Sequence, residues 1–199
     1  MEITTAMVKE LREVTGAGVL DCKKALEESL GDPEKAAAML RQKGITKAAK
    51  KASRATGEGR IETYVHTGCK VASVVELRCE TDFVARTEDF KSLAHDIAMQ
   101  IAAVKPLYLT QEHIPDDVLE EKRSFYRQQA EETGKPEHIL DKIVEGKLKG
   151  YYAEVCLILQ PFIKDTDRMI QEVITDHIAK LGENIQVTRF ARFELGEED

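Results

Sequence analysis

The stretch Cys79-Glu80-Thr81-Asp82-Phe83-Val84-Ala85-Arg86 marks the point where a strand pattern ends and a helix pattern begins. Before it, apolar and polar residues alternate over residues 71–79, as they do in a half-buried strand. After it, Thr87 can cap a helix whose apolar positions recur at spacings of three and four. The sequence therefore predicts a turn that carries Asp82 beside Phe83, where side chains are available to a partner. The local pattern alone equally allows Phe83 to fold back into the core.

The strand pattern continues on both sides of this turn. Residues 61–66 alternate in the same way, and Thr67-Gly68 can form the turn of a hairpin. Residues 185–195 form a last strand that we expect to pair with this hairpin. Helical spacings occupy much of the chain between them, while residues 156–165 read as an irregular apolar segment. We expect an α+β domain, with a three-stranded antiparallel sheet and helices packed on one face.

The N-terminal part predicts a small three-helix bundle. Gly16-Ala17-Gly18 separates the first helix from the second, and Val14 and Val19 belong to their apolar stripes. Asp32-Pro33 provides a cap and a first-turn proline for the third helix, whose alanine-rich run is predicted to stop at Gly44. Residues 45–55 then continue as a basic helix or a flexible tether. Three short helices leave little core of their own, and such units mostly bind other proteins.

A change of pattern and charge indicates the domain boundary. Thr56-Gly57-Glu58-Gly59 interrupts the helical pattern, which places the bundle and a basic linker in residues 1–55 and the α+β core in residues 56–199. Residues 1–60 carry 12 Lys and Arg against 9 Asp and Glu, whereas the chain as a whole has a net charge of −7. The basic tract of residues 43–54 could hold phosphates, but it has no interleaved aromatic residues to stack bases.

Motifs for chemistry are missing from the sequence. The four cysteines have no Cys-x-x-Cys spacing and the five histidines no His-Glu-x-x-His spacing, so we expect reduced thiols and no metal site. Neither a phosphate-binding Gly-x-x-x-x-Gly-Lys loop nor a Gly-x-Ser-x-Gly elbow occurs. No catalytic residues are predicted. The N-terminus has no signal-peptide pattern and no window reaches about 18 apolar residues, so the sequence predicts a cytoplasmic protein without a membrane span.

Several motifs in this order resemble the elongation factor Ts family. They are Val8-Lys9-Glu10-Leu11-Arg12, Thr15-Gly16-Ala17-Gly18, Asp21-Cys22-Lys23-Lys24-Ala25-Leu26, Thr81-Asp82-Phe83-Val84-Ala85, Gly134-Lys135-Pro136, Ile143-Val144-Glu145-Gly146, Gln160-Pro161-Phe162 and Gly182-Glu183-Asn184-Ile185. The resemblance covers nearly the whole chain and indicates a short form with a single core subdomain. Longer members carry two copies of that subdomain and an inserted helical arm. This chain is expected to have one copy and no such arm.

The resemblance implies a ubiquitin-associated-like bundle and a guanine-nucleotide exchange factor that is not an enzyme. Such a factor binds the GDP form of elongation factor Tu, promotes GDP release by disturbing the partner's Mg²⁺ site, and remains bound until GTP re-enters. The implied contacts near the Mg²⁺ site are Thr81, Asp82, Phe83 and Val84. Those implied for the bundle are Val8, Leu11, Arg12 and Lys23. The family implies no cofactor, no direct nucleic-acid contact and no membrane contact.

A single core subdomain suggests a homodimer, because two chains would restore the two copies of longer members and give a two-plus-two complex with elongation factor Tu. The candidate contacts are the final strand, with Phe190 and Phe193 on opposite faces, and the apolar residues 155–163. A monomer with a polar free sheet face is the alternative. Two other classes of function stay open: an RNA-associated protein that uses the basic tract, and an unrecognised hydrolase or transferase.

Overall fold

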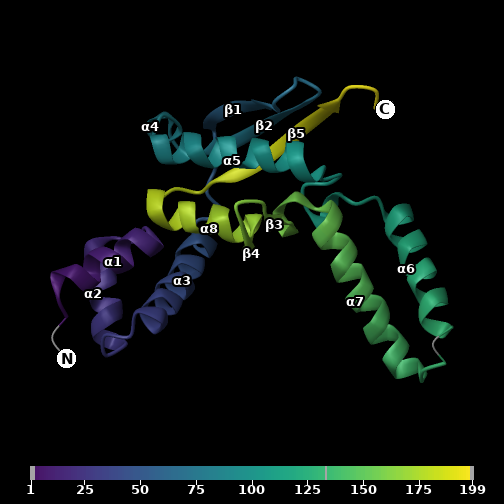
Figure 1. Ribbon diagram of the computed structural model, residues 1–199, viewed down its shortest axis with the longest axis horizontal. Coiled ribbons are helices and arrows are strands. Elements are labelled where there is room, and N and C mark those ends of the chain that lie inside the picture. Colours follow the sequence, from purple (N-terminus) through teal and green to yellow (C-terminus); the bar gives the residue numbers. More distant parts are fainter. Residues whose placement is uncertain (1–2, 133, 198–199) are drawn as a thin grey trace. The chain divides into compact units, whose positions relative to one another are not determined.

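The computed structural model describes residues 3–132 and 134–197 (Figure 1). These residues form two compact units. Unit 1 combines the chain up to Glu62 with Glu76–His95 and Glu172–Val187, and unit 2 combines Thr63–Val75 and Asp96–Gln171 with the chain from Thr188 onward. The predicted boundary near residue 55 concerns independent folding and stays a prediction. The outermost residues of the two predicted domains, 1–2 and 198–199, lie outside the described residues.

The N-terminal part of unit 1 is the expected three-helix bundle of α1 (Thr5–Thr15), α2 (Val19–Glu28) and α3 (Pro33–Ala49). The Thr4 hydroxyl caps α1 by accepting a hydrogen bond from the Met7 amide at 3.3 Å, and Asp32 caps α3 in the same way. One hydrophobic cluster of buried side chains lies within the bundle: Val8, Leu11, Cys22, Ala25, Leu26, Ala36 and Leu40. The bundle therefore has a core, although a small one.

The predicted stop of the third helix at Gly44 is wrong, because α3 continues to Ala49. Of the two possibilities for residues 45–55, the structure shows the helix up to Ala49. Gly44 is buried within the helix, and a Cβ placed on it would lie 3.4 Å from the Cβ of Ala179. The absence of a side chain at this position serves close packing against α8 (Ile170–Leu181), rather than helix termination.

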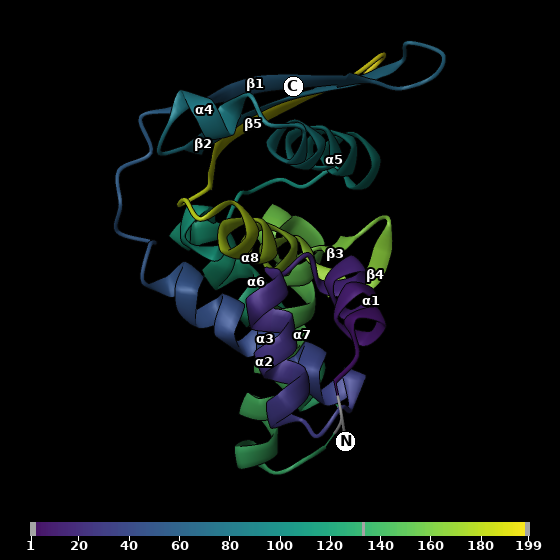
Figure 2. The same cartoon turned by 90° about the vertical axis from the view of Figure 1, so that its left-hand side faces the viewer.

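The main sheet has the strand order β1 (Glu58–Val65), β2 (Val71–Cys79) and β5 (Gln186–Glu194). The prediction that the last strand pairs with the hairpin is therefore confirmed. Helix α5 (Glu88–Val104) lies against one face of the sheet (Figure 2), and the Ser73 hydroxyl on β2 donates to the Ala98 carbonyl on α5 at 2.6 Å. The fold is α+β, as expected.

Unit 2 contains a hairpin of two helices, whereas we expected this chain to lack a helical arm. Helix α6 (Asp116–Glu131) packs along α7 (Glu137–Val155) (Figure 1), around the buried residues Ala130, Leu140, Val144 and Leu148. The expectation that this chain lacks a helical arm is wrong, because the apolar stripes of these helices pack on each other.

The segment read as irregular contains further short elements. A single-turn helix η2 (Leu157–Leu159) precedes the two-stranded sheet of β3 (Pro161–Phe162) and β4 (Asp165–Met169). Outside this segment, a further single-turn helix, η1 (Gln111–His113), precedes α6. No helix of the described residues is both long and apolar enough to cross a membrane.

Candidate functional site

The turn after β2 displays Phe83 to solvent. Asp82–Ala85 form a single helical turn, α4, whose N-terminus is capped by Thr81: its hydroxyl accepts a hydrogen bond from the Val84 amide at 3.4 Å. Ala85 is buried and fixes the inner side of the turn, whereas Phe83 is 78% exposed. Of the two possibilities that the sequence left open, the structure shows the exposed ring.

The carboxylate beside this ring is also accessible. Asp82 lies 2.8 Å from the Arg86 guanidinium, one helical turn further along, and about 42% of its side-chain surface is exposed. Exposed pairs of this kind contribute about 0–1 kcal/mol, so a partner could replace Arg86 at small cost. The sequence predicted Asp82 but not Arg86 as part of this site.

The backbone that leads into the turn is held by a residue about one hundred positions away. The Glu183 carboxylate accepts hydrogen bonds from the amides of Glu80 and Thr81, both at 3.0 Å, and from the Thr81 hydroxyl at 2.6 Å. The next residue, Asn184, donates its backbone amide to the Glu80 carboxylate at 2.6 Å. The motif around Glu183 was visible in the sequence, but no local pattern connects it to the turn.

Cys79 closes the inner side of the site. Its buried thiol donates to the Thr81 carbonyl at 3.1 Å, and burial, followed by the nearby Glu183 charge, raises the thiol pKa to about 11. The thiol is therefore protonated at neutral pH and is a poor nucleophile or metal ligand. Throughout residues 3–132 and 134–197, no three His, Cys, Asp or Glu side chains gather as a metal site.

The residues predicted for the bundle do not share one surface. Val8 and Leu11 are buried in the core of the bundle, while Arg12 and Lys23 are exposed. In so small a unit, apolar side chains at helical spacing are buried in the core. The pair that can meet a partner directly is Arg12 and Lys23, and their role stays a prediction.

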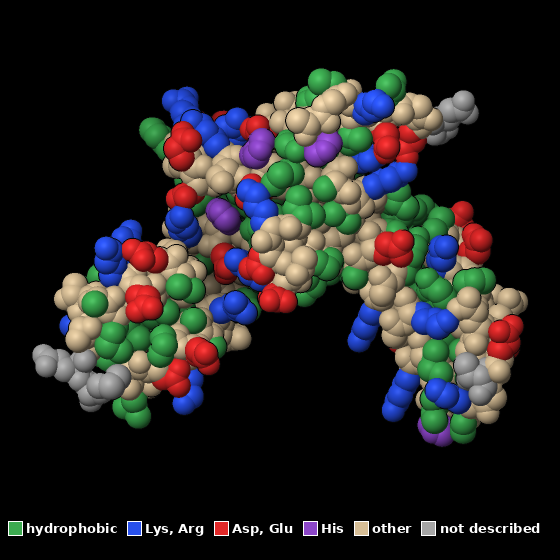
Figure 3. All heavy atoms as spheres, viewed as in Figure 1, with side chains coloured by type: hydrophobic (Ala, Val, Ile, Leu, Met, Phe, Trp, Pro, Cys, Tyr) green, Lys and Arg blue, Asp and Glu red, His purple; other side chains and the backbone are tan. Residues whose placement is uncertain are grey.

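Other apolar side chains reach the surface of the bundle. Figure 3 shows apolar groups exposed over α1–α3, and the most exposed large ones near the α1–α2 turn are Val14, Val19 and Leu20. Val14 and Val19 were expected in the core stripes. Val14 is the next-to-last residue of α1 and Val19 is the first residue of α2, and both side chains are exposed.

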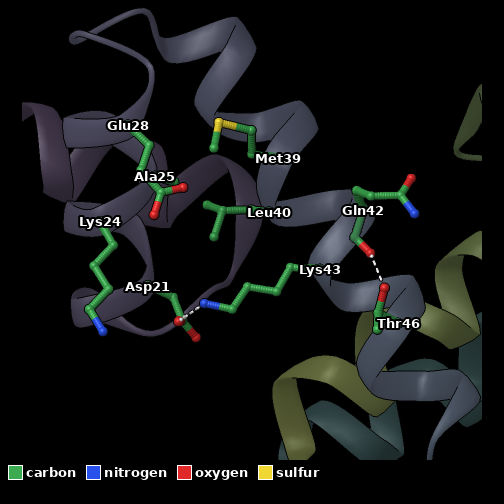
Figure 4. A pocket seen from close by; sticks show the side chains of 9 residues that line it. All are labelled: Asp21, Lys24, Ala25, Glu28, Met39, Leu40, Gln42, Lys43 and Thr46. Atoms are coloured by element: carbon green, nitrogen blue, oxygen red, sulfur yellow. Dashed lines mark hydrogen bonds and ion pairs between the residues drawn. The ribbon is translucent and has the colours of Figure 1, made fainter.

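A pocket of ≈ 370 Å³ lies between α2 and α3 of the bundle (Figure 4). Asp21 on α2 accepts hydrogen bonds from Lys43 at 2.6 Å and from Lys47 at 3.0 Å, both on α3. These bonds lower the pKa of Asp21. The charges of the pocket wall thus join the two helices, and they also neutralise part of the basic tract.

Comparisons with known proteins agree with these motifs. A family model described as "Elongation factor TS" matches residues 5–197. Similar proteins include the elongation factors Ts of Carboxydothermus hydrogenoformans, 56% identical over 98% of this chain and 90% of the relative, and of Heliobacterium modesticaldum, 55% identical over 98% and 91%. That of Thermosipho melanesiensis is 53% identical over 98% of this chain and 100% of the relative.

Proposed function

Because the chain belongs to the elongation factor Ts family, we propose that it is a guanine-nucleotide exchange factor for elongation factor Tu in the cytoplasm. It binds the GDP form of that GTPase, promotes GDP release and remains bound until GTP re-enters. The observation that supports this role most directly is Phe83, an apolar ring held 78% exposed on an anchored turn. Turns that are held by a rigid scaffold present their side chains to binding partners.

The proposed mechanism acts on the partner's Mg²⁺ site. Phe83 wedges between elements of the partner, and Asp82 exchanges its bond with Arg86 for groups that support the water shell of the ion. Mg²⁺ neutralises charge between the nucleotide phosphates and the GTPase, so disturbing its outer ligands weakens GDP binding as well. Thr81 and Val84 hold the geometry of the turn during this contact.

The N-terminal bundle supplies a second contact in this proposal. Its exposed apolar side chains, Val14, Val19 and Leu20, provide area, and Arg12 lies on the same helix as Val14. The core residues Val8 and Leu11 support this surface from inside. The proposal needs no cofactor on this chain and no direct contact with nucleic acid. Lys43 and Lys47 of the basic tract are engaged by Asp21 and do not favour the RNA alternative.

We also propose that the chain forms a homodimer through the face of β5 that carries Phe193, giving a two-plus-two complex. Arg192 donates to the Ala102 carbonyl on α5 at 3.1 Å, so the adjacent Phe193 points to the opposite face of the sheet, where it is 64% exposed. The other candidate, residues 155–163, is less suitable because Val155, Cys156 and Leu157 are buried within the chain.

The dimer has a simple test in light scattering. A dimer alone and a two-plus-two complex are expected, with a monomer after Phe193→Asp. A monomeric wild-type chain and a one-to-one complex at micromolar concentration would contradict the dimer without affecting the exchange role.

The exchange role is tested by rapid mixing of the chain with elongation factor Tu loaded with fluorescent GDP, under excess GTP. The expected result is a release rate that rises with the concentration of the chain and then saturates. In a parallel series with Mg²⁺ removed by chelation, the added chain should accelerate release much less, because its proposed target is already lost. An unchanged rate in Mg²⁺ removes the proposed function, and equal acceleration in both series removes the Mg²⁺ route.

A further inference from the structure

We propose that Glu183 is a positioning residue for nucleotide exchange, which acts by fixing the turn that carries Phe83. The inference rests on the proposed function and concerns the same site. Glu183 does not need to touch the partner in order to act. Its carboxylate binds the backbone immediately before α4, and thereby sets the direction in which Phe83 leaves the protein surface.

The turn cannot hold this direction by itself. Helix α4 contains four residues, and its closing backbone bonds, from Ala85 to Thr81 and from Arg86 to Asp82, are 3.3 and 3.2 Å long. Isolated helical segments of this length are unstable, because fixing the first turn costs more conformational entropy than its bonds return. A rigid direction for the Phe83 ring therefore requires an external support.

Glu183 provides this support with both of its carboxylate oxygens. Oε2 accepts from two successive backbone amides, those of Glu80 and Thr81, and Oε1 accepts from the Thr81 hydroxyl. Hydrogen bonds to an ionised acceptor are about twice as strong as neutral ones. The Thr81 hydroxyl also accepts from the Val84 amide, so a continuous chain of hydrogen bonds runs from Glu183 into α4.

The segment around Glu183 is itself fixed at several points. Gly182 ends α8 with a positive φ of 82°, a conformation that favours glycine, and donates its amide to the Ile178 carbonyl at 3.0 Å. On the other side, the Asn184 side-chain amide donates to the carbonyls of Ala52 at 3.3 Å and Arg54 at 2.9 Å. The Gly182–Asn184 loop thus joins the end of α8, the linker after α3 and the exposed turn.

A variant of Glu183 can therefore change the orientation of the turn without removing the side chains that contact the partner. Glu183→Ala leaves Phe83 and Asp82 in place but removes three acceptor contacts from the turn. We expect the exchange rate at saturating factor to fall on the order of tenfold to a hundredfold, as for other losses of orientation, with a smaller change in half-saturating concentration. Glu183→Gln keeps one acceptor oxygen and should fall between wild type and Glu183→Ala.

The experiment is a double-mutant cycle on GDP release with wild type, Phe83→Ala, Glu183→Ala and the double variant. If Glu183 acts through Phe83, Glu183→Ala slows wild type but adds little to Phe83→Ala. The matched control is Glu88→Ala, since Glu88 lies close in sequence to the turn but pairs with Lys91 at 2.7 Å. This control should exchange like wild type.

A second measurement does not depend on activity. Hydrogen exchange of the Glu80 and Thr81 amides should accelerate in Glu183→Ala, and less in Glu183→Gln, while the helical circular dichroism is retained. If Glu183→Ala does not fold, Glu183→Gln takes its place in the double-mutant cycle.

The outcomes separate the two proposals. A Phe83→Ala variant as fast as wild type overturns the proposed function of the turn. Two results would overturn the positioning role alone, provided that Phe83→Ala exchanges slowly. One is a wild-type rate in Glu183→Ala, and the other is a double variant in which the two single effects multiply in full.

Discussion

Replacing Phe83 by Ala should separate binding from folding more clearly than any other single change. Complete burial of an aromatic side chain removes about 150–250 Å² of surface from water. Because Phe83 is 78% exposed, only the small remainder is buried in the free protein, and its truncation should lower the free energy of unfolding by about 1 kcal/mol. The exposed part amounts to about 150 Å², and its burial against a partner is worth up to about 4 kcal/mol. This corresponds to a loss of several hundredfold in exchange efficiency, at about 1.4 kcal/mol per factor of ten.

The assay is stopped-flow release of fluorescent GDP from elongation factor Tu, with thermal unfolding of the free variant measured in parallel. Phe125→Ala is the matched control, because Phe125 is another exposed Phe, at 50%, but lies on α6 in the helical arm. The control should exchange like wild type. A Phe83→Ala variant that loses several kcal/mol of stability, as a buried Phe would, contradicts the role of Phe83 as an exposed contact. An unchanged exchange rate contradicts it as well.

Three further changes are expected to have graded effects. Asp82→Ala should slow GDP release less than Phe83→Ala, because one hydrogen bond to a charged group is worth about 1.5–3 kcal/mol, and an equal or larger loss would contradict the wedge. Deletion of residues 1–55 should leave the core folded by circular dichroism but weaken binding of elongation factor Tu; a collapsed core would contradict the boundary, and unchanged affinity the docking role. Burial raises the thiol pKa of Cys79 and Cys156 from 9.0 to about 11, so each thiol favours the folded state fully below pH 9. This contribution is lost as pH rises from 9 to 11, and Cys79→Ala should flatten the decline of the urea midpoint over that range.

The sequence predicted those features that depend on local pattern. The strand 71–79, the cap at Thr87 and the apolar stripe of α5 all follow from residues close to one another, and the structure confirms them. Exposure of Phe83 could not be decided in this way. It depends on how the turn is held, and Glu183 reaches it from a distant part of the chain.

Tertiary packing decides the features that the local pattern left undetermined. Gly44 has the residue type of a helix end, but a neighbouring Ala179 explains it as a site of close approach. Val8 and Leu11 have the spacing of a helix face, which cannot distinguish a face that binds a partner from one that forms the core. The short strands of residues 161–169 bury few side chains and therefore leave little periodicity in the sequence.

In the proposed mechanism, this chain and GDP weaken each other's binding to elongation factor Tu. The most direct measurement is the affinity of the chain for the GTPase, by titration calorimetry, without nucleotide and at increasing GDP. Because coupling between two binding sites is reciprocal, the factor by which GDP weakens the chain must equal the factor by which the chain weakens GDP. We expect a strong loss of affinity that is equal in both directions. An affinity for the chain that does not change with GDP would contradict it.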